Sequence, residues 1–320
     1  MKIKLFKLVT IFALIGLAMG CTTPMPPISP MPISTAALPT ATLSPILTSI
    51  SSVTSTTNIL SQTLTIGDYQ FLMECSGAGS PVVLLLGGRA EAWKPIQTEI
   101  NRFTRTCVFD HVGTSPTPLM GEEIAKNMHT LLKDAEMTGP YMLVGFSAGG
   151  FIGRLFANLY PDEVAGIALL DSSHEDQNAR FLAALPSEAS DECQELKDYR
   201  TELQGPHVIP IGSEINLDFD ATADEVRDLE ENLGDLPLVV LTAGHSEWPN
   251  CFPPEVARQL DQAWLNLQDE LASLSSNSAH LVAKESGHSF DDPAGMQAVI
   301  EAIQRVIDAV RNGVGVSIKH

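Results

Sequence analysis

The chain has 320 residues, of which 44% are hydrophobic and 18% are charged, and its formal net charge is −20. The hydrophobic content is enough for a large core and excludes an intrinsically disordered protein. The negative balance argues against nucleic acid and anionic lipid surfaces as partners, because both would be repelled.

The first 20 residues have the pattern of a secretion signal. Three lysines among the first seven residues precede an uncharged apolar stretch, Leu8 to Ala18, that is too short to span a bilayer comfortably. The stretch leads to Gly20 and Cys21 and resembles a bacterial lipoprotein signal, whose cysteine is lipidated and becomes the new N-terminus. The resemblance implies export and a lipid anchor at Cys21 on the outer face of a bacterial membrane, with secretion after ordinary cleavage as the alternative.

Residues 21–59 are expected to form a disordered tether. Ser, Thr and Pro account for 23 of the 39 residues from 22 to 60, and none of the 39 is charged. Such a composition cannot bury enough apolar surface to offset chain entropy. The folded domain is expected to span 60–320. Without the three lysines of the signal, it has 16 basic against 39 acidic residues, a formal balance of −23.

From residue 60 onward, apolar segments of strand length alternate with segments of helical periodicity. Strands are expected at 64–66, 69–73, 81–86, 106–109, 141–146, 164–170, 236–241 and 280–283, the first two forming a hairpin. Helices are expected at 93–103, 122–135, 148–159 and 255–274, with a last one starting at Asp292-Pro293. This alternation indicates a mostly parallel sheet with helices on both faces.

One segment interrupts the alternation. Residues 172–235 contain 17 acidic and 4 basic residues and no convincing strand. An insertion of this size between two core strands predicts a cap or lid of short helices.

Gly145-Phe146-Ser147-Ala148-Gly149 joins the strand at 141–146 to the helix that follows it. A G-x-S-x-G turn of this kind needs glycines, because side chains on its flanks would collide with the backbone. The turn holds the serine hydroxyl out of the sheet, and the pattern therefore predicts a nucleophile elbow with Ser147 at its apex.

At this point the sequence resembles the α/β-hydrolase superfamily, from residue 60 to the end. The segments that carry the resemblance come in the order of the family: Leu86-Gly87-Gly88-Arg89, Asp110-His111-Val112-Gly113, the elbow, Ala165 to Asp171, and Ser286-Gly287-His288. The resemblance implies a doubly wound, mostly parallel sheet of eight strands in the order 1-2-4-3-5-6-7-8, with a helical cap insertion.

The resemblance also implies a catalytic triad. Ser147 is the expected nucleophile, and His288, separated from the last strand by four residues, stands where the family has its general base. Three other histidines are expected on loops at the same edge of the sheet, and none has the right order after the serine and the acid: His111, His174 and His245.

The acid of the triad has two candidates. Asp171 ends the sixth strand, and the stretch 170–177 looks like a motif of one exported hydrolase subgroup. Glu247 follows the seventh strand, which is the commoner location in the family. Either carboxylate could orient the imidazole, and we favour Asp171. Asp291 and Asp292 are better explained as the start of the last helix.

Backbone N–H groups of Ala148 and Arg89 are the expected oxyanion-hole donors, by their positions in the family pattern. The family often has His-Gly where this chain has Gly87-Gly88. The side chain of Arg89 is expected either to pair with a nearby acid or to meet a substrate carboxylate.

Apart from Cys21, the chain has an even number of cysteines, which agrees with a compartment where disulfides persist. The four are Cys75, Cys107, Cys193 and Cys251, and they allow three pairings or four buried thiols. The strand order of the family would make the strands of Cys75 and Cys107 neighbours, which favours that pair and leaves Cys193 with Cys251. The sequence has no C-x-x-C motif and no Cys/His cluster, and it therefore does not indicate a metal site.

These features together predict a serine hydrolase that cleaves an ester, thioester or related acyl bond of a small molecule through an acyl-enzyme, without metal or organic cofactor. Amidase and cofactor-free peroxidase activities would fit the same triad. Epoxide and halide hydrolysis is disfavoured, because that chemistry uses an aspartate at the elbow in this superfamily. A catalytically silent lipoprotein that binds a ligand or partner is the alternative from another class.

Overall fold

The computed structural model describes residues 59–211, 215–229, 232–246 and 248–316 of the chain. These residues belong to one compact unit, Thr57–His320. The expected signal and tether, Cys21 and Glu247 lie outside the described residues.

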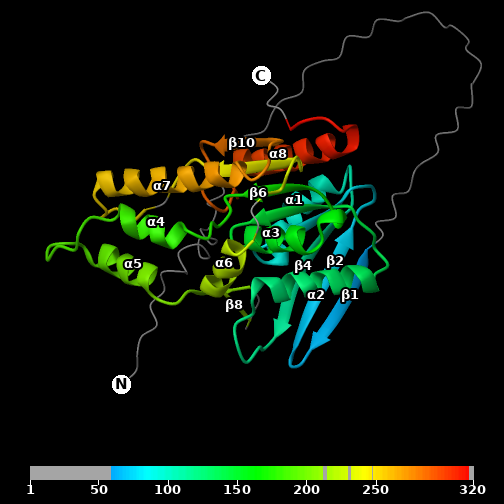
Figure 1. Cartoon of the computed structure of the whole chain (residues 1–320), viewed down its shortest axis with the longest axis horizontal. Helices are drawn as coiled ribbons and strands as arrows, with labels where there is room; N and C mark the ends of the chain where they lie inside the picture. Colours follow the sequence, from blue (N-terminus) through cyan, green and yellow to red (C-terminus); the bar gives the residue numbers. More distant parts are fainter. Residues whose placement is uncertain (1–58, 212–214, 230–231, 247, 317–320) are drawn as a thin grey trace, which may run out of the picture. The chain divides into compact units, whose positions relative to one another are not determined.

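Eight strands form the central sheet in the order β1-β2-β4-β3-β5-β6-β9-β10 (Figure 1). Their bounds are β1 Leu60–Ile66, β2 Tyr69–Ser76, β3 Val82–Leu86, β4 Thr106–Gly113, β5 Tyr141–Phe146, β6 Val164–Leu170, β9 Leu238–Ala243 and β10 Ser278–Ala283. β2 runs antiparallel to both of its neighbours, and all other neighbouring pairs are parallel. This is the strand order that the resemblance implies.

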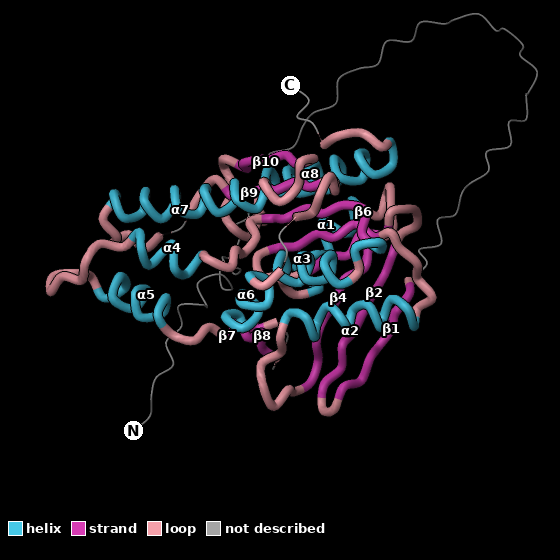
Figure 2. Tube along the Cα trace, in the orientation of Figure 1, coloured by secondary structure: helices cyan, strands magenta, loops and turns pink. Residues whose placement is uncertain are grey.

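Helices cover both faces of the sheet (Figure 2). Side chains of α2 and α3 pack in one core layer and those of α1 and α8 in the other. The helix bounds are α1 Ala90–Ile100, α2 Gly121–Asp134, α3 Gly149–Leu159, α7 Pro254–Ala272 and α8 Pro293–Asn312, with a short 3₁₀ turn at Pro161–Glu163. Asp292 caps α8 through its carboxylate, as expected.

The central strands are buried on both sides because successive side chains point into opposite layers. In β3, Leu84 and Leu86 pack in the layer with α2 and α3, whereas Val83 and Leu85 pack in the layer with α1 and α8. A strand covered on both faces needs a continuous apolar sequence. This explains why these segments read as apolar runs rather than as alternating patterns.

One expected loop is part of a strand. Residues 110–113 were expected to close the strand at 106–109, but β4 continues to Gly113. The reason is pairing with β2, where Phe71 lies opposite His111 and Tyr69 opposite Gly113. The sequence could not show this, because a polar strand end is stabilised by a partner that lies far away along the chain.

Among the described residues between β6 and β9 there are three helices, α4 Gln177–Ala184, α5 Gln194–Gln204 and α6 Phe219–Arg227. α4 and α5 lie beside the N-terminal half of α7, away from the sheet (Figure 1). The segment also has an antiparallel pair of three-residue strands, β7 Val208–Pro210 and β8 Asn216–Asp218, where no strand was expected. Strands this short leave no periodic signal in a sequence.

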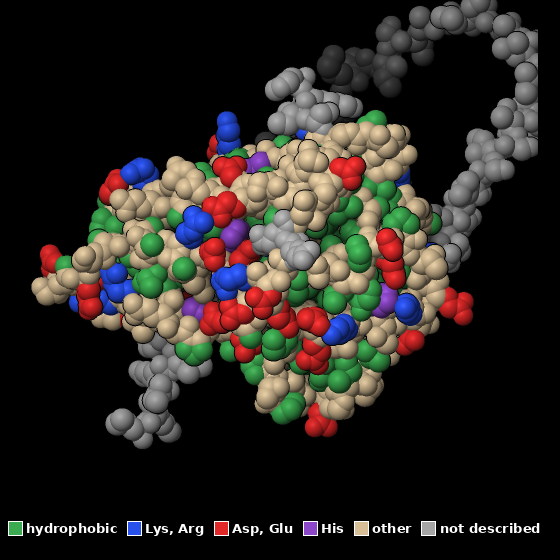
Figure 3. Space-filling model, viewed as in Figure 1, with side chains coloured by type: hydrophobic (Ala, Val, Ile, Leu, Met, Phe, Trp, Pro, Cys, Tyr) green, Lys and Arg blue, Asp and Glu red, His purple; other side chains and the backbone are tan. Residues whose placement is uncertain are grey.

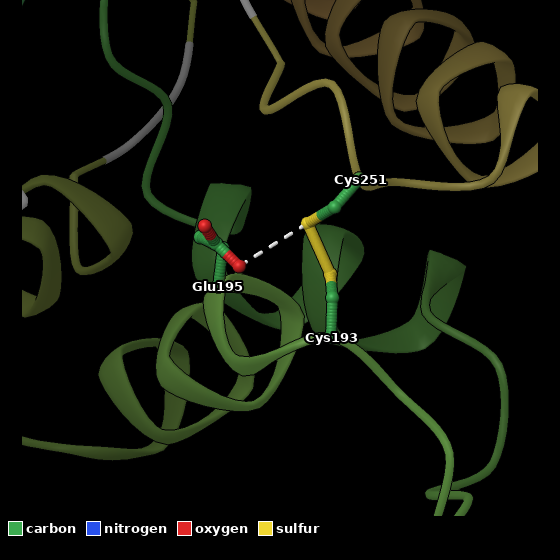
Figure 4. Close-up of side chains that lie close together, drawn as sticks. All are labelled: Cys193, Glu195 and Cys251. Atoms are coloured by element: carbon green, nitrogen blue, oxygen red, sulfur yellow. Dashed lines mark hydrogen bonds between the residues drawn. A yellow bond between two sulfur atoms is a disulfide. The ribbon is translucent and has the colours of Figure 1, made fainter.

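Two disulfides are formed, Cys75–Cys107 and Cys193–Cys251, which are the pairs that were favoured. Cys75 and Cys107 lie directly opposite each other on β2 and β4, with their Cα atoms 4.0 Å apart. Cys193 precedes α5 and Cys251 lies on the loop between β9 and α7 (Figure 4). The second disulfide therefore ties the inserted segment to the core chain.

Acidic side chains gather on one part of the surface, over α6 and the neighbouring end of α2 (Figure 3). Glu225 of α6 accepts a hydrogen bond from the backbone N–H of Glu122 there, and burial raises the pKa of its carboxyl. No helix within the described ranges is both long and apolar enough to cross a membrane.

Candidate active site

Ser147 lies between β5 and α3 in a left-handed backbone conformation, with φ +52°. Such a conformation costs a non-glycine residue about 1–2 kcal/mol. Hydrogen bonds to the segment around the end of β6 hold it in place. The N–H of Ser147 donates to the C=O of Leu170 at 3.2 Å, and its own C=O accepts from the N–H of Ser173 at 3.0 Å and from Ser172 Oγ at 3.2 Å.

The glycines of this turn allow one backbone to lie directly on another. A Cβ atom at Gly145 would lie 2.6 Å from the Cα of Gly150, and one at Gly149 would lie 2.2 Å from the C=O oxygen of Leu86. The start of α3 therefore rests against the end of β3 with no room for a side chain. This is the geometry of the predicted elbow.

Asp171 and His288 meet at the carboxyl end of the sheet although 117 residues separate them. Nδ1 of His288 lies 2.6 Å from Oδ2 of Asp171. A carboxylate at Nδ1 holds the proton there in the neutral ring and leaves the lone pair on Nε2. Phe146, the residue before Ser147, packs its ring 4.9 Å from the His288 ring. The imidazole thus lies against the strand that leads into the elbow.

Asp171 is 3% exposed, and both of its carboxylate oxygens have partners. Oδ1 accepts hydrogen bonds from the backbone N–H of Ala243 at 3.0 Å and from Nε1 of Trp264 at 2.8 Å. The backbone N–H of Asp171 donates to Leu241 at 2.6 Å, and its φ is +40°. Asp171, directly after β6, is therefore fixed by the end of β9, by α7 and by His288.

Trp264 was not among the expected site residues. It lies on α7 four residues after Leu260 and three before Leu267, both fully buried, so helical spacing puts it on the inward face. A buried tryptophan usually finds an acceptor for its N–H. The sequence could show the need for an acceptor, but only the fold shows that the acceptor is Asp171.

Of the three rival histidines, His174 and His245 lie on the loops after β6 and β9, as expected, and His111 does not lie on a loop. His111 is buried in β4 with its ring stacked 4.3 Å from Phe71, and burial lowers its pKa to about 4. His174 is 6% exposed, accepts a hydrogen bond from the N–H of Asp176, and has a pKa lowered chiefly by burial. His245 is exposed on the loop after β9. Among the described residues, none of these three is hydrogen-bonded to Asp171.

The expectation that His111 lies on a loop at the site edge is therefore wrong, for the reason given above for β4. Glu247, the other candidate acid, falls outside the described residues, so its position is not compared with that of Asp171.

Ala148 and Arg89 are the residues directly before α3 and α1. Across the described ranges, the N–H groups of these two residues donate to no protein acceptor. N–H groups at helix starts carry partial positive charge and suit an anionic oxygen. Both residues remain available as oxyanion donors.

Gly87 brings the loop of Arg89 against the elbow. With φ +84°, a Cβ at Gly87 would lie 2.2 Å from the C=O oxygen of Phe146. Its own C=O accepts a hydrogen bond from Nε1 of Trp93 at 2.7 Å, which fixes the turn from the other side. In this structure, a side chain at position 87 would therefore collide with the backbone of the elbow.

The side chain of Arg89 is exposed, and no carboxylate of a described residue lies within ion-pair distance of it. The expected pairing with a nearby acid is thus not found in that part of the chain. The guanidinium is therefore an exposed positive charge in a domain whose net charge is negative.

In the described part of the chain, one group of side chains has the spacing of metal ligands, namely Cys193, Glu195 and Cys251. Figure 4 shows the two cysteines joined to each other, with Oε2 of Glu195 3.4 Å from Sγ of Cys251. Sulfurs in a disulfide carry no proton and are not thiolate ligands. The group is explained by the disulfide.

Comparison with known proteins agrees with the strand order. The model of the family described as alpha/beta hydrolase fold matches residues 81–197. Among solved structures, an esterase from Thermogutta terrifontis superposes with a TM-score of 0.50 and 20% identity, covering 78% of this chain and 99% of its own. The protein has the α/β-hydrolase fold.

Two further matches are also distant from this chain in sequence. Alpha/beta hydrolase domain-containing protein 10 from mouse superposes with a TM-score of 0.51 and 16% identity, covering 78% of this chain and 99% of its own. YqjL from Bacillus subtilis (strain 168) is 27% identical over 214 residues, which are 65% of this chain and 76% of that protein. At such identities the structural likenesses show the fold alone.

Proposed function

We propose that this protein is a serine hydrolase that cleaves an ester, thioester or related acyl bond of a small molecule through an acyl-enzyme. The observation that carries the proposal is the 2.6 Å contact between Nδ1 of His288 and Oδ2 of Asp171, beside the glycine turn that presents Ser147. The α/β-hydrolase fold supports hydrolase activity in general. The identity of the nucleophile and the mechanism are our inference.

In the proposed mechanism, Oγ of Ser147 attacks the acyl carbon while Nε2 of His288 takes its proton. Asp171 keeps the other ring nitrogen protonated and stabilises the imidazolium that forms. The N–H groups of Ala148 and Arg89 donate to the oxygen that becomes negative, and each such donor contributes roughly 3–4 kcal/mol.

The His288 imidazolium then returns its proton to the leaving group, which departs and leaves the acyl group on Ser147. Water attacks the acyl-enzyme with His288 again as base, and the acid product and free Ser147 result. Every step uses side chains or backbone groups of this chain and one water, so the scheme balances without another reactant.

The charge of the domain limits the substrate class. An acidic surface repels polyanions, which disfavours highly phosphorylated or polyacidic substrates. Arg89 is an exposed cation without an acidic partner among the described residues, and it suits a substrate with a single carboxylate.

A fluorophosphonate probe tests the proposal, because it phosphonylates an activated serine and does not depend on knowing the substrate. We expect the parent protein to be labelled and Ser147→Ala to lose the label. Ser273→Ala, which removes an exposed hydroxyl at the end of α7, is the matched control and should label like the parent.

Equal labelling of the parent and Ser147→Ala would refute Ser147 as the nucleophile. Absence of label from both would favour the alternative of a catalytically silent protein on this fold.

A further inference from the structure

The indole of Trp264 lies between the proposed catalytic acid and the cap. Its N–H donates to Oδ1 of Asp171 at 2.8 Å, and its ring centre is 5.9 Å from that of Phe181 on α4. Phe181 belongs to a buried group on α4, α5, α7 and the residues next to them, which we call the cap cluster: Phe181, Leu185, Leu196, Leu203, Phe252, Val256 and Leu260. Trp264 packs against this cluster.

The orientation of the Asp171 carboxylate matters for the proposed reaction. The side chain of an aspartate turns about its terminal bond, and its two oxygens are chemically equal. Here they have different environments, because Oδ2 faces His288 while Oδ1 accepts from Ala243 and Trp264. The three donors lie on three separate parts of the chain, and together they hold the Asp171 carboxylate in one orientation.

The two donors to Oδ1 are not equivalent. The N–H of Ala243 belongs to the end of β9, which the sheet holds in place. The N–H of Trp264 belongs to a half-buried side chain whose ring packs against the cap cluster. A hydrogen bond to a charged carboxylate is about twice as strong as one between neutral groups. Losing it leaves Oδ1 with a single donor.

We propose that Trp264 is a positioning residue for Asp171, which keeps Oδ2 directed at Nδ1 of His288. The inference rests on the proposed function, since it assigns a role in activating Ser147. Because the same ring packs against the cap cluster, a change in the packing of the cap also changes how Asp171 is held.

The test measures how fast a fluorophosphonate probe labels Ser147, resolved into the maximal rate constant and the half-saturating probe concentration. In Trp264→Phe an aromatic ring stays, although a smaller one, and the N–H is lost. We expect the maximal rate constant to fall roughly tenfold, because a charge-assisted hydrogen bond is lost. The half-saturating concentration should change less than about twofold, because Trp264 acts on Asp171 rather than on the probe.

Trp248→Phe is the matched control. Trp248 packs in the same region, and its indole N–H donates to Oδ1 of Asp261 at 2.6 Å rather than to Asp171. We expect this variant to label like the parent. All variants are compared well below their own melting midpoints, so that a loss of stability does not enter the comparison.

Trp264→His is the rescue variant, because it returns a ring N–H on a smaller side chain. We expect it to label faster than Trp264→Phe. If Trp264→Phe labels as fast as Trp248→Phe, or if only its half-saturating concentration rises, the proposal is wrong. Equal slowness of the His and Phe variants would also overturn it, because ring size would then be the cause.

These outcomes are separate from failure of the proposed function. That function fails if the parent and Ser147→Ala label alike. The role of Trp264 fails when the label depends on Ser147 but not on the indole N–H.

Discussion

At the scale of single residues, backbone strain gathers around the proposed triad. In the described part of the chain, four non-glycine residues have φ between +40° and +53°, and three of them are Ser147, Asp171 and Phe290. Phe290 follows His288 by two residues. Strain of this kind persists only where surrounding contacts enforce it, and it is often found at functional sites. Here the hydrogen bonds of Ser147 and Asp171 to neighbouring strands enforce it.

The choice of acid leads to a prediction at this scale. In Asp171→Asn, the side chain amide can no longer stabilise an imidazolium, and turnover of a p-nitrophenyl ester should fall by about 10³-fold or more. The turnover of Glu247→Gln should fall less than about threefold. If Asp171→Asn kept its turnover and Glu247→Gln lost most of it, the assignment would be reversed and Glu247 would be the acid.

At the scale of elements, the site depends on the contact between the end of β3 and the start of α3. Gly87 and Gly149 meet there, and the N of Gly87 would lie 2.6 Å from a Cβ at Gly149. One proposed oxyanion donor precedes α3 and the other precedes α1, so this contact sets the distance between them. A shift of either element would move one donor away from the other.

Gly149→Ala tests that contact. The added methyl group would have to push α3 away from Leu86, and we expect a loss of about 1–3 kcal/mol in the free energy of unfolding together with a large loss of probe labelling. Gly205→Ala is the control, because the nearest atom to its Cβ would be 3.5 Å away, an ordinary contact. For both variants, denaturant unfolding gives the free energy of unfolding, and the fluorophosphonate probe gives the extent of labelling. Equal stability of the two variants would contradict the steric explanation.

At the scale of the whole molecule, buried histidines in an acidic domain make stability depend on pH. Burial lowers the pKa of His111 to about 4, and a backbone hydrogen bond with Ile211 acts in the opposite direction. The unfolded chain, with a histidine pKa near 6.5, therefore binds more protons than the folded protein between pH 6.5 and 4. The contribution of His111 to stability is therefore fully present above pH 6.5 and is lost as the pH falls from 6.5 to 4.

The loss attributable to His111 across the window is about 3 kcal/mol, at about 1.4 kcal/mol for each unit of pKa difference. His111→Phe keeps a flat ring against Phe71 and removes the titration. We expect its unfolding free energy to fall less steeply than that of the parent from pH 6.5 to 4. Parallel pH profiles of the two proteins would show that His111 does not contribute.

The sequence by itself determined the series of core strands and helices and the glycine turn at Ser147, whereas the two disulfide pairs were favoured only through the strand order that the resemblance implies. Continuous apolar runs indicate strands buried on both faces, and spaced apolar residues indicate helices, because burial imposes those patterns on the local sequence. Ser147 could be singled out because a tight strand-to-helix turn needs glycines within two residues. Export and lipid attachment at Cys21 stay predictions.

Only the tertiary structure decided which distant groups meet. Asp171 bonds His288 across 117 residues and Trp264 across 93, while His111 is drawn into β4 by pairing with β2. No local pattern encodes such contacts, because a hydrogen-bond partner far along the chain leaves no periodic trace near either residue. The physical reason is that side-chain spacing reports what is buried, whereas the partner of a buried polar group depends on how the elements pack.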